Sequence, residues 1–99
     1  MDHIELFKAL SNKSRLQILE WLKEPEINFP EQMADCYEHG VCVGQIQAKS
    51  GLTQSTVSEY LSILQRAGFI KSKRVGQWTY YKRNEKAFTE LSKIIESNI

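Results

Sequence analysis

The sequence predicts a mainly α-helical domain with a small β-hairpin, an α+β fold of about five helices plus two strands. Apolar residues recur at helical spacing along most of the 99 residues, whereas the stretch at 69–82 alternates polar with apolar side chains. The hydrophobic fraction of 41% and the charged fraction of 25% are ordinary for a globular protein. We therefore expect a single domain over residues 1–99, with a core so small that the chain gains stability by pairing.

Two amphipathic helices are predicted at the N-terminal end, over residues 2–10 and about 13–24. Asn12 is suited to cap the second helix, because its side-chain oxygen can accept an otherwise unpaired backbone N–H. Pro25 is expected to stop that helix. The apolar side chains that this helix is expected to turn toward the core are Leu16, Ile18, Leu19 and Leu22.

The segment 25–40 is acidic and is bracketed by two prolines and a glycine. It is longer than the usual connection between helices, which makes it the least regular part of the predicted fold. We expect a short helix from Pro30 to His39, because proline suits a first helical position and Gly40 suits the left-handed residue beyond a helix end.

The second half of the chain begins with a predicted helix, a tight turn and a longer helix. Residues 43–50 form the first helix, Gly51 ends it, and Thr53 caps the longer helix at about 54–67. One side of the longer helix is expected to form a buried stripe of Val57, Leu61 and Leu64. Its opposite side is polar.

A β-hairpin and a terminal helix complete the predicted fold. The hairpin at 69–82 turns at Gly76, which we expect in a positive φ conformation. Strand alternation favours a core position for its aromatic residues, and stacking on an unpaired base is the alternative; these residues are Trp78, Tyr80 and Tyr81. Asn84 is suited to cap the terminal helix at 84–99. The broad apolar face of that helix contains Phe88, Leu91, Ile94, Ile95 and Ile99.

The formal net charge of +1 hides a division along the chain. Residues 49–83 hold seven bases against one acid, Glu59, and carry +6, while the remainder holds six bases against eleven acids and carries −5. So basic a segment attracts polyanions, of which a phosphate backbone is the commonest, because each neutralised phosphate releases condensed counterions. A solvated surface with uneven charge is the alternative.

The predicted elements follow one another in the order of a winged helix-turn-helix. A helix that enters a major groove about 12 Å wide needs short hydrogen-bonding side chains at its leading end, since bulky ones hold the backbone away from the bases. Basic and polar side chains on the hairpin bind phosphates or reach into the flanking minor groove. The residues predicted to contact DNA are Gln54, Ser55, Thr56, Ser58 and Glu59 on the helix and Lys71, Lys73, Arg74 and Gln77 on the hairpin. Without the other observations, the polar residues of this helix would be interpreted as the solvent-exposed face of an amphipathic surface helix.

Several separated segments resemble the ArsR-type winged-helix repressors of bacteria, and the resemblance runs along most of the chain. The principal segments are LFKALSNKSRLQIL at 6–19, VCVGQI at 41–46, GLTQSTVS at 51–58 and GQWTYY at 76–81. The resemblance implies a homodimer built from the first and last helices, a recognition helix at about 54–67 and a wing at about 69–82. The family often has histidine where Glu59 and Tyr60 stand here, so its base preference does not carry over. Glu59 either accepts from a cytosine amino group or lies in solvent.

These observations predict a sequence-specific regulator of transcription that binds double-stranded DNA, a dimeric repressor that acts by occupying a promoter. The terminal helices are expected to form the dimer seam, and two-fold pairing predicts an inverted-repeat operator. No stretch approaches the roughly 20 apolar residues that span a bilayer, and the N-terminus carries acid where a secretory signal carries base. We therefore expect a cytoplasmic protein without a membrane partner.

Two cysteines raise the alternative of a metal- or thiol-responsive sensor that releases DNA. Many members of the family that the chain resembles respond to metals, but their Cys-x-Cys pair is broken here, since Gly44 follows Cys42, and the terminal helix contains no histidine. Cys36, His39 and Cys42 have a spacing that suits a soft metal, with His3 as the fourth ligand, and a reversible disulfide between the two thiols is the other alternative. Inert thiols are the simplest interpretation. We predict no metal site, no cofactor and no evident inducer.

Two other classes of function compete with DNA binding. An enzyme is not expected, because the two histidines stand in no nucleophile pattern and no glycine-rich phosphate loop is present. A winged-helix protein–protein adaptor is the second rival, since a fold does not dictate its partner. The basic hairpin argues against an adaptor.

Overall fold

Six helices and a three-stranded antiparallel sheet make up the part of the chain that the computed structural model describes, residues 2–31 and 37–99. This is the predicted mainly α fold with a β-hairpin, with one strand more than expected. The helices are α1 (His3–Leu10), α2 (Lys13–Lys23), α3 (Pro25–Asn28), α4 (Val43–Ser50), α5 (Gln54–Arg66) and α6 (Glu85–Asn98). The strands are β1 (Val41–Cys42), β2 (Ile70–Val75) and β3 (Trp78–Arg83).

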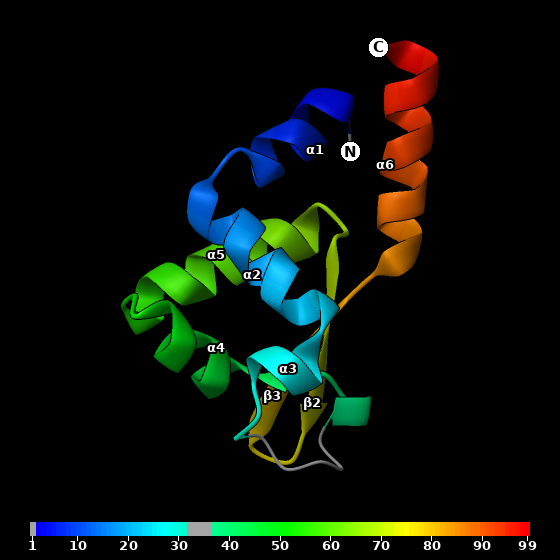
Figure 1. Cartoon of the computed structure of the whole chain (residues 1–99). Helices are drawn as coiled ribbons and strands as arrows, with labels where there is room; N and C mark the ends of the chain where they lie inside the picture. The colour runs from blue at the N-terminus through cyan, green and yellow to red at the C-terminus, as the bar shows by residue number, and fades with distance from the viewer. Residues whose placement is uncertain (1, 32–36) are drawn as a thin grey trace.

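The molecule has two different ends (Figure 1). α1 and α6 lie at one end, together with both termini, while the hairpin of β2 and β3 points its tip toward the other end. α2 and α5 lie between these ends. Among the described residues, no helix combines the length and apolar character that crossing a membrane requires.

One hydrophobic core joins α2, α4, α5 and the sheet. Its largest fully buried side chains are Ile18, Phe29, Val41, Ile46, Val57, Leu61, Leu64, Phe69 and Ile70. The predicted buried stripe of α5 is therefore confirmed. The prediction for Leu16 is wrong, because this side chain is 49% exposed. Leu16 precedes Ile18 by two residues, which places it about 200° around the helix from the buried face.

Two of the three predicted side-chain caps are present. Asn12 and Thr53 begin α2 and α5, and each accepts the backbone N–H three residues further on, at 2.9 and 3.2 Å. Asn84 precedes α6 but makes no side-chain cap, so that prediction is wrong. Its amide nitrogen instead donates to the Gly68 carbonyl at 2.9 Å and ties the start of α6 to the end of α5.

The segment after α2 differs from the prediction. α2 ends before Pro25 as expected, but Pro25 then begins α3, since proline suits the first position of a helix. Phe29 follows α3 and is buried, which fixes the chain there, and Pro30 lies in a turn. The predicted helix from Pro30 to His39 is therefore wrong at its start. Its residues 32–36 lie outside the described residues.

The sheet has the order β1-β3-β2, and β1 is the strand that the sequence did not predict. β1 aligns Val41 with Tyr81 and Cys42 with Tyr80. A strand of two residues is too short to show alternation, so no pattern in the sequence could reveal it.

β2 and β3 form the predicted hairpin, which closes with Val75 opposite Trp78. Gly76 has φ 62° as expected, whereas Gln77 has no positive φ, and this combination is that of a type II′ turn. Such turns match the natural twist of paired strands, so the tip has a defined geometry.

Gly40 precedes β1 and lies close to the backbone of β3. Its φ of 112° is positive as predicted, and a Cβ placed there would lie 2.3 Å from the carbonyl oxygen of Tyr81. Glycine alone tolerates both the backbone conformation and the close approach.

Gly40→Ala is expected to lower the free energy of unfolding by about 2 kcal/mol or more, because the backbone of β3 must move away from the new methyl group. Urea unfolding measures the loss. Gly44→Ala is the matched control, since Gly44 lies in α4 with open space around it, and little change or a slight stabilisation is expected. Equal losses in the two variants would contradict this assignment.

Candidate nucleic-acid interface

The turn between α4 and α5 sets the direction in which α5 begins. Gly51 ends α4 in the left-handed conformation with φ 70°, and its N–H donates to the Gln47 carbonyl at 3.1 Å. Thr53 then caps α5. Leu52 packs against the core between them, so the turn is anchored on its inner side.

The predicted residues of α5 lie together on the outer side of its first turns. Gln54, Ser55, Ser58 and Glu59 are exposed, opposite the buried stripe. Thr56 is half-buried, and its hydroxyl accepts from the Thr53 hydroxyl at 2.9 Å, so it is the least available of the five. Exposed serines and a glutamine offer donors and acceptors on short side chains, which suits base edges in a groove.

The predicted hairpin residues are all exposed, but they lie on both faces of the ribbon. In the antiparallel register Lys73 is opposite Tyr80 and Arg74 is opposite Thr79, and directly opposed residues share a face. Lys71 therefore lies on the face of Lys73, and Arg74 lies on the other. The Arg74 Nε donates to the Gly76 carbonyl at 3.2 Å, which holds its side chain at the turn.

The three hairpin aromatics divide between core and solvent. Tyr80 is buried, and Tyr81 is half-buried against the core, where burial raises the pKa of its hydroxyl. Both confirm the core prediction. Trp78 is 53% exposed, so the prediction is wrong there. It lies next to the turn, where β3 extends past the core.

Tyr60 ties the middle of α5 to the corner between α1 and α2. Its hydroxyl accepts from the Asn12 side-chain amide at 3.5 Å, and the Arg15 guanidinium lies 5.3 Å from its ring centre. Arg15 also donates to the carbonyls of Ala9 and Lys8, near the end of α1, at 2.7 and 3.0 Å. These contacts of Tyr60 and Arg15 connect α1, α2 and α5.

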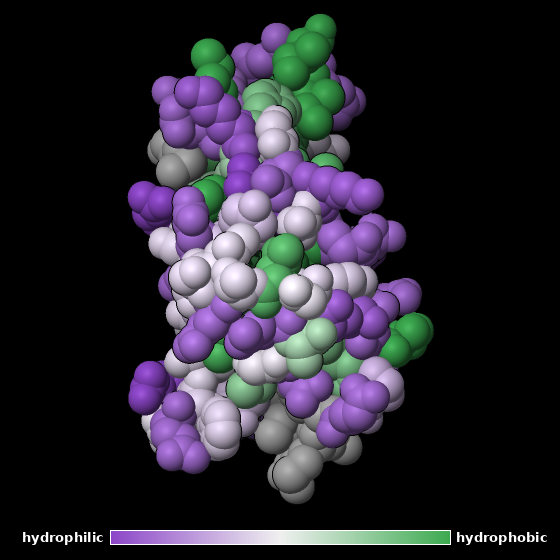
Figure 2. Space-filling view, turned by 90° about the vertical axis from the view of Figure 1, so that its left-hand side faces the viewer, coloured by the Kyte–Doolittle hydropathy of each residue, from purple (hydrophilic) through white to green (hydrophobic). Residues whose placement is uncertain are grey.

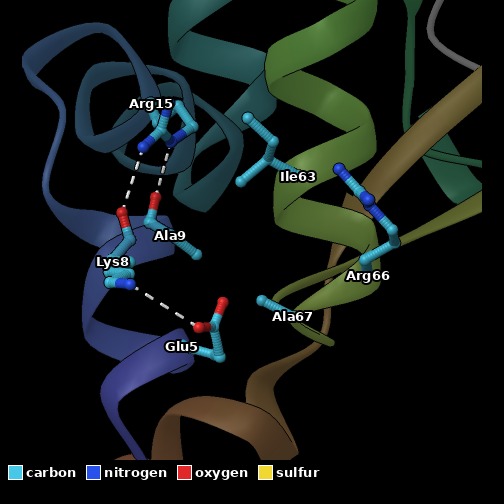
Figure 3. Close-up of a pocket in the computed structure, with 7 residues that line it drawn as sticks. All are labelled: Glu5, Lys8, Ala9, Arg15, Ile63, Arg66 and Ala67. Carbon is cyan, nitrogen blue, oxygen red and sulfur yellow. Dashed lines mark hydrogen bonds and ion pairs between the residues drawn. The ribbon is translucent and has the colours of Figure 1, made fainter.

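A cavity of about 270 Å³ lies beside this corner, between α1 and α5 (Figure 3). Figure 3 shows Arg15 turned toward the two α1 carbonyls, while Glu5 pairs with Lys8 at 3.7 Å on the α1 side. Ile63 and Ala67 line the cavity from α5. Beside this open cavity, the two hydrogen bonds of Arg15 connect α2 to the end of α1.

Arg15→Met is expected to lower the free energy of unfolding by about 1–3 kcal/mol, because two helix-end carbonyls lose a charged donor. Chemical denaturation measures the change. Lys13→Met is the matched control: Lys13 is exposed on the same helix, and a change within about 0.5 kcal/mol is expected. Comparable losses for both would show that the contacts of Arg15 contribute nothing.

The cysteine hypothesis receives no support from the described residues. No group of three or more His, Cys, Asp or Glu side chains is placed to hold a metal ion in residues 2–31 and 37–99. His39 packs against the Tyr80 ring, with 5.7 Å between ring centres. Cys36 lies outside the described residues, so the alternative of a Cys36–His39–Cys42 site is not tested.

The surface around the α4–α5 turn differs from the end that carries the termini. In the view of Figure 2 the middle of the face is mostly pale, of intermediate hydropathy, with one strongly hydrophobic group at its centre and strongly hydrophilic side chains around it. Strongly hydrophobic side chains gather at the top, the end of α1 and α6. A helix, a tight turn, an outward polar helix and a basic hairpin define a winged helix-turn-helix protein.

Comparisons with known proteins agree. The profile of the family described as "Bacterial regulatory protein, arsR family" matches residues 38–72. An HTH-type transcriptional regulator of Bacillus subtilis (strain 168), YbzH, is 55% identical over 100 residues, which cover 100% of both chains. The chain belongs to the ArsR family of bacterial transcriptional regulators.

More distant relatives share the fold. The transcriptional activator HlyU of Vibrio cholerae is 29% identical over 93 residues, which cover 94% of this chain and 70% of HlyU. A homodimeric winged helix-turn-helix DNA-binding domain from Mycobacterium bovis superimposes with a TM-score of 0.66 at 24% identity, over 94% of this chain and 74% of that one. An ArsR-like regulator from Rhodococcus sp. RHA1 gives 0.70 at 18% identity, with the same coverage of 94% and 74%.

Proposed function

We propose that this protein is a sequence-specific regulator that binds double-stranded DNA as a homodimer and represses transcription by occupying a promoter. The observation that carries the proposal is the row of short exposed side chains at the leading end of α5, opposite a fully buried stripe. Gln54, Ser55, Ser58 and Glu59 then face the base edges of a major groove, with Thr56 at the margin of the contact. Membership of a family of transcriptional regulators supports this use.

The wing supplies the second part of the proposed interface. Lys71, Lys73, Arg74 and Gln77 are exposed on the hairpin, and residues 69–83 contain no acid. Lysine and arginine bind phosphates without regard to sequence, so the wing positions the protein while α5 reads the bases. Such binding weakens as salt concentration rises.

The terminal helices form the proposed dimer seam. Ile95 is 47% exposed, and Ile4 and Ile99 are also exposed at the same end of the molecule. An open groove of about 440 Å³ runs along α6 between Phe88 and Glu96. A second copy covers this apolar surface and sets two α5 helices at a fixed spacing, which predicts an inverted-repeat operator. The M. bovis domain is named as homodimeric.

The direction of regulation is part of the proposal. One relative, from Halobacterium salinarum, is named as a putative arsenical resistance operon repressor, ArsR2, and another, HlyU, as an activator. We favour repression, because a dimer that reads an inverted repeat needs only to occupy a promoter to block it. An increase in transcription from a promoter that the purified protein binds would contradict this direction.

Ser55→Ala combined with Ser58→Ala is expected to weaken operator binding about tenfold or more, because each change removes a donor and acceptor from the leading end of α5. Fluorescence anisotropy on an operator selected by the wild-type protein measures the loss, and circular dichroism checks the fold. Ser62→Ala is the control, since Ser62 is exposed on the same helix but lies about 10 Å beyond Ser55 along the helix axis, away from the leading end. Unchanged affinity of the double variant would refute the assignment of α5.

Ile95→Asp is expected to convert dimers to monomers, because a buried carboxylate at the seam has no partner. Sedimentation velocity measures the mass, and operator affinity should fall with it. Ile27→Asp places the same charge at a side chain that is 72% exposed on α3, away from α6, and should leave the dimer intact. A dimeric Ile95→Asp protein would place the seam elsewhere.

A further inference from the structure

The cavity between α1 and α5 collects positive charge from three helices. Among the described residues, its charged lining consists of Lys8 and Glu5 from α1, Arg15 from α2 and Arg66 from α5. Three bases against one acid give this lining a formal charge of +2. Glu5 pairs with Lys8 at 3.7 Å, which is a weak pair because both side chains are more than half exposed. The two arginines therefore have no carboxylate of their own in the cavity.

Both arginines keep N–H groups that a ligand can use. Arg15 donates from Nε and Nη2 to the carbonyls of Ala9 and Lys8, which leaves its Nη1 without an acceptor among the described residues. Within residues 2–31 and 37–99, no hydrogen bond or ion pair holds the guanidinium of Arg66. Figure 3 shows Arg15 on the side of the cavity next to α1 and Arg66 on the α5 side. A guanidinium presents its donors in a planar fork that matches a carboxylate.

The rest of the lining is apolar. It consists of Ala9, Ile63 and Ala67, of which Ala9 is only 4% exposed. The volume of about 270 Å³ has room for about nine non-hydrogen atoms, at about 30 Å³ for each. An occupant with an apolar part removes these side chains from water, whereas phosphate or sulfate leaves them hydrated. Positive charge beside apolar side chains therefore favours an organic acid over an inorganic anion.

Arg66 is not one of the bases proposed to bind DNA. It is the last residue of α5, 12 positions after Gln54, which places it about 18 Å along the helix axis from the leading end. A base in the last turn of a helix is also stabilised by the helix dipole. The dipole accounts for one arginine, but it does not account for three bases from three helices around one cavity.

We propose that this cavity binds a small organic acid, a carboxylate attached to an apolar body of about six carbon atoms. Arg15 and Arg66 bind the carboxylate, while Ala9, Ile63 and Ala67 contact the apolar body. Neither cysteine nor histidine is among the described lining residues, so the site is separate from the cysteine alternative. No motif in the sequence indicates this site, because its residues come from three separate helices.

Occupancy of the cavity also affects operator binding, and this part of the inference rests on the proposed function. The cavity lies between α1, which belongs to the proposed dimer seam, and α5, which is proposed to read the bases. An acid bound there changes how α1 packs on α5, and with it the spacing of two α5 helices in a dimer. It also adds negative charge to a protein that is proposed to bind phosphates. Operator affinity is therefore expected to fall when the cavity is occupied.

The site is tested first without DNA, with benzoate as the probe. Titration followed by heteronuclear NMR should shift the amide signals of Ala9, Ile63 and Ala67, with a Kd of about 1 mM. Benzamide has the same shape without the charge, and sulfate has charge without the apolar body, so each should bind about tenfold more weakly or worse. Benzoate that causes no shifts, shifts only signals away from the cavity, or binds no more tightly than these two compounds would overturn the proposal.

Two charge variants should move the affinity for benzoate in opposite directions. Arg66→Gln removes an exposed guanidinium that the fold does not use, and benzoate should bind about fivefold more weakly. Glu5→Gln removes the carboxylate that repels the acid, and benzoate should bind about threefold more tightly. Lys13→Gln is the matched control, since Lys13 is exposed on α2 and does not line the cavity, and affinity should stay unchanged. Equal effects of Arg66→Gln and Lys13→Gln would reduce the site to general attraction of anions and overturn it.

Ala67→Met fills the cavity without changing its charge. The larger side chain occupies the space of the apolar body, so benzoate should bind about tenfold more weakly or worse. Circular dichroism checks that the variant folds, and Arg66→Gln tests the same site if it does not. Wild-type affinity for benzoate in folded Ala67→Met protein would place the acid outside this cavity.

Operator binding then tests the regulatory part. Ionic strength is held constant, because DNA affinity itself depends on salt. Benzoate at about ten times its Kd should weaken binding to an operator selected by the wild-type protein about fivefold, while benzamide should not, and the Arg66→Gln protein should respond less. Benzoate that binds in the cavity and leaves operator affinity unchanged would overturn the regulatory part alone. A wild-type protein that selects no operator would overturn the proposed function, while the NMR titration would still decide whether the acid binds.

Discussion

The burial of one side of α5 determines what the rest of the interface presents. Val57, Leu61 and Leu64 are fully buried, and each contributes about 1.5–3 kcal/mol through the hydrophobic effect. A rotation of α5 by one residue, about 100°, would turn all three of these side chains away from the core and polar side chains toward it. The core therefore fixes the polar face outward, although none of the polar residues contributes to it. The orientation of the candidate contact residues is therefore set by the buried stripe of α5, which lies outside the candidate interface.

The position of α5 is fixed by polar contacts as well. The ring of Tyr60 lies beside Arg15, which also binds the end of α1, and the Asn84 amide binds the carbonyl just past the end of α5. α1 and the start of α6 are thus connected to α5 through named side chains. Because the proposed seam uses these two helices, the spacing between recognition helices in a dimer follows from the same contacts.

Local patterns in the sequence were sufficient for much of the fold. The caps at Asn12 and Thr53, the buried stripe of α5 and the turn at Gly76 each depend on residues within a few positions of one another. The candidate contact residues of α5 were accessible for the same reason, since a helix-turn-helix is continuous in sequence. The exposure of Gln54, Ser55, Ser58 and Glu59 agrees with the prediction and Thr56 is half-buried, while the contact of these residues with DNA stays a proposal.

Several of the misses depend on contacts between distant parts of the chain. β1 exists because it pairs with β3, and the Asn84 amide is drawn from its cap position by a carbonyl 16 residues away. The link between Asn12 and Tyr60 joins residues 48 apart. Trp78 follows the alternation of its strand, yet alternation cannot tell where the core beneath that strand ends.

β2 lies at the edge of the sheet, and within the described part of the chain no strand pairs with its outer side. An unpaired edge is a template for other strands, and natural proteins protect such edges with charge. Lys71, Lys73 and Arg74 all stand on this strand. The charged side chains proposed to bind phosphates therefore also oppose edge-to-edge aggregation of the protein. This second role does not depend on DNA, so a related protein that no longer bound an operator would still need charged residues on β2.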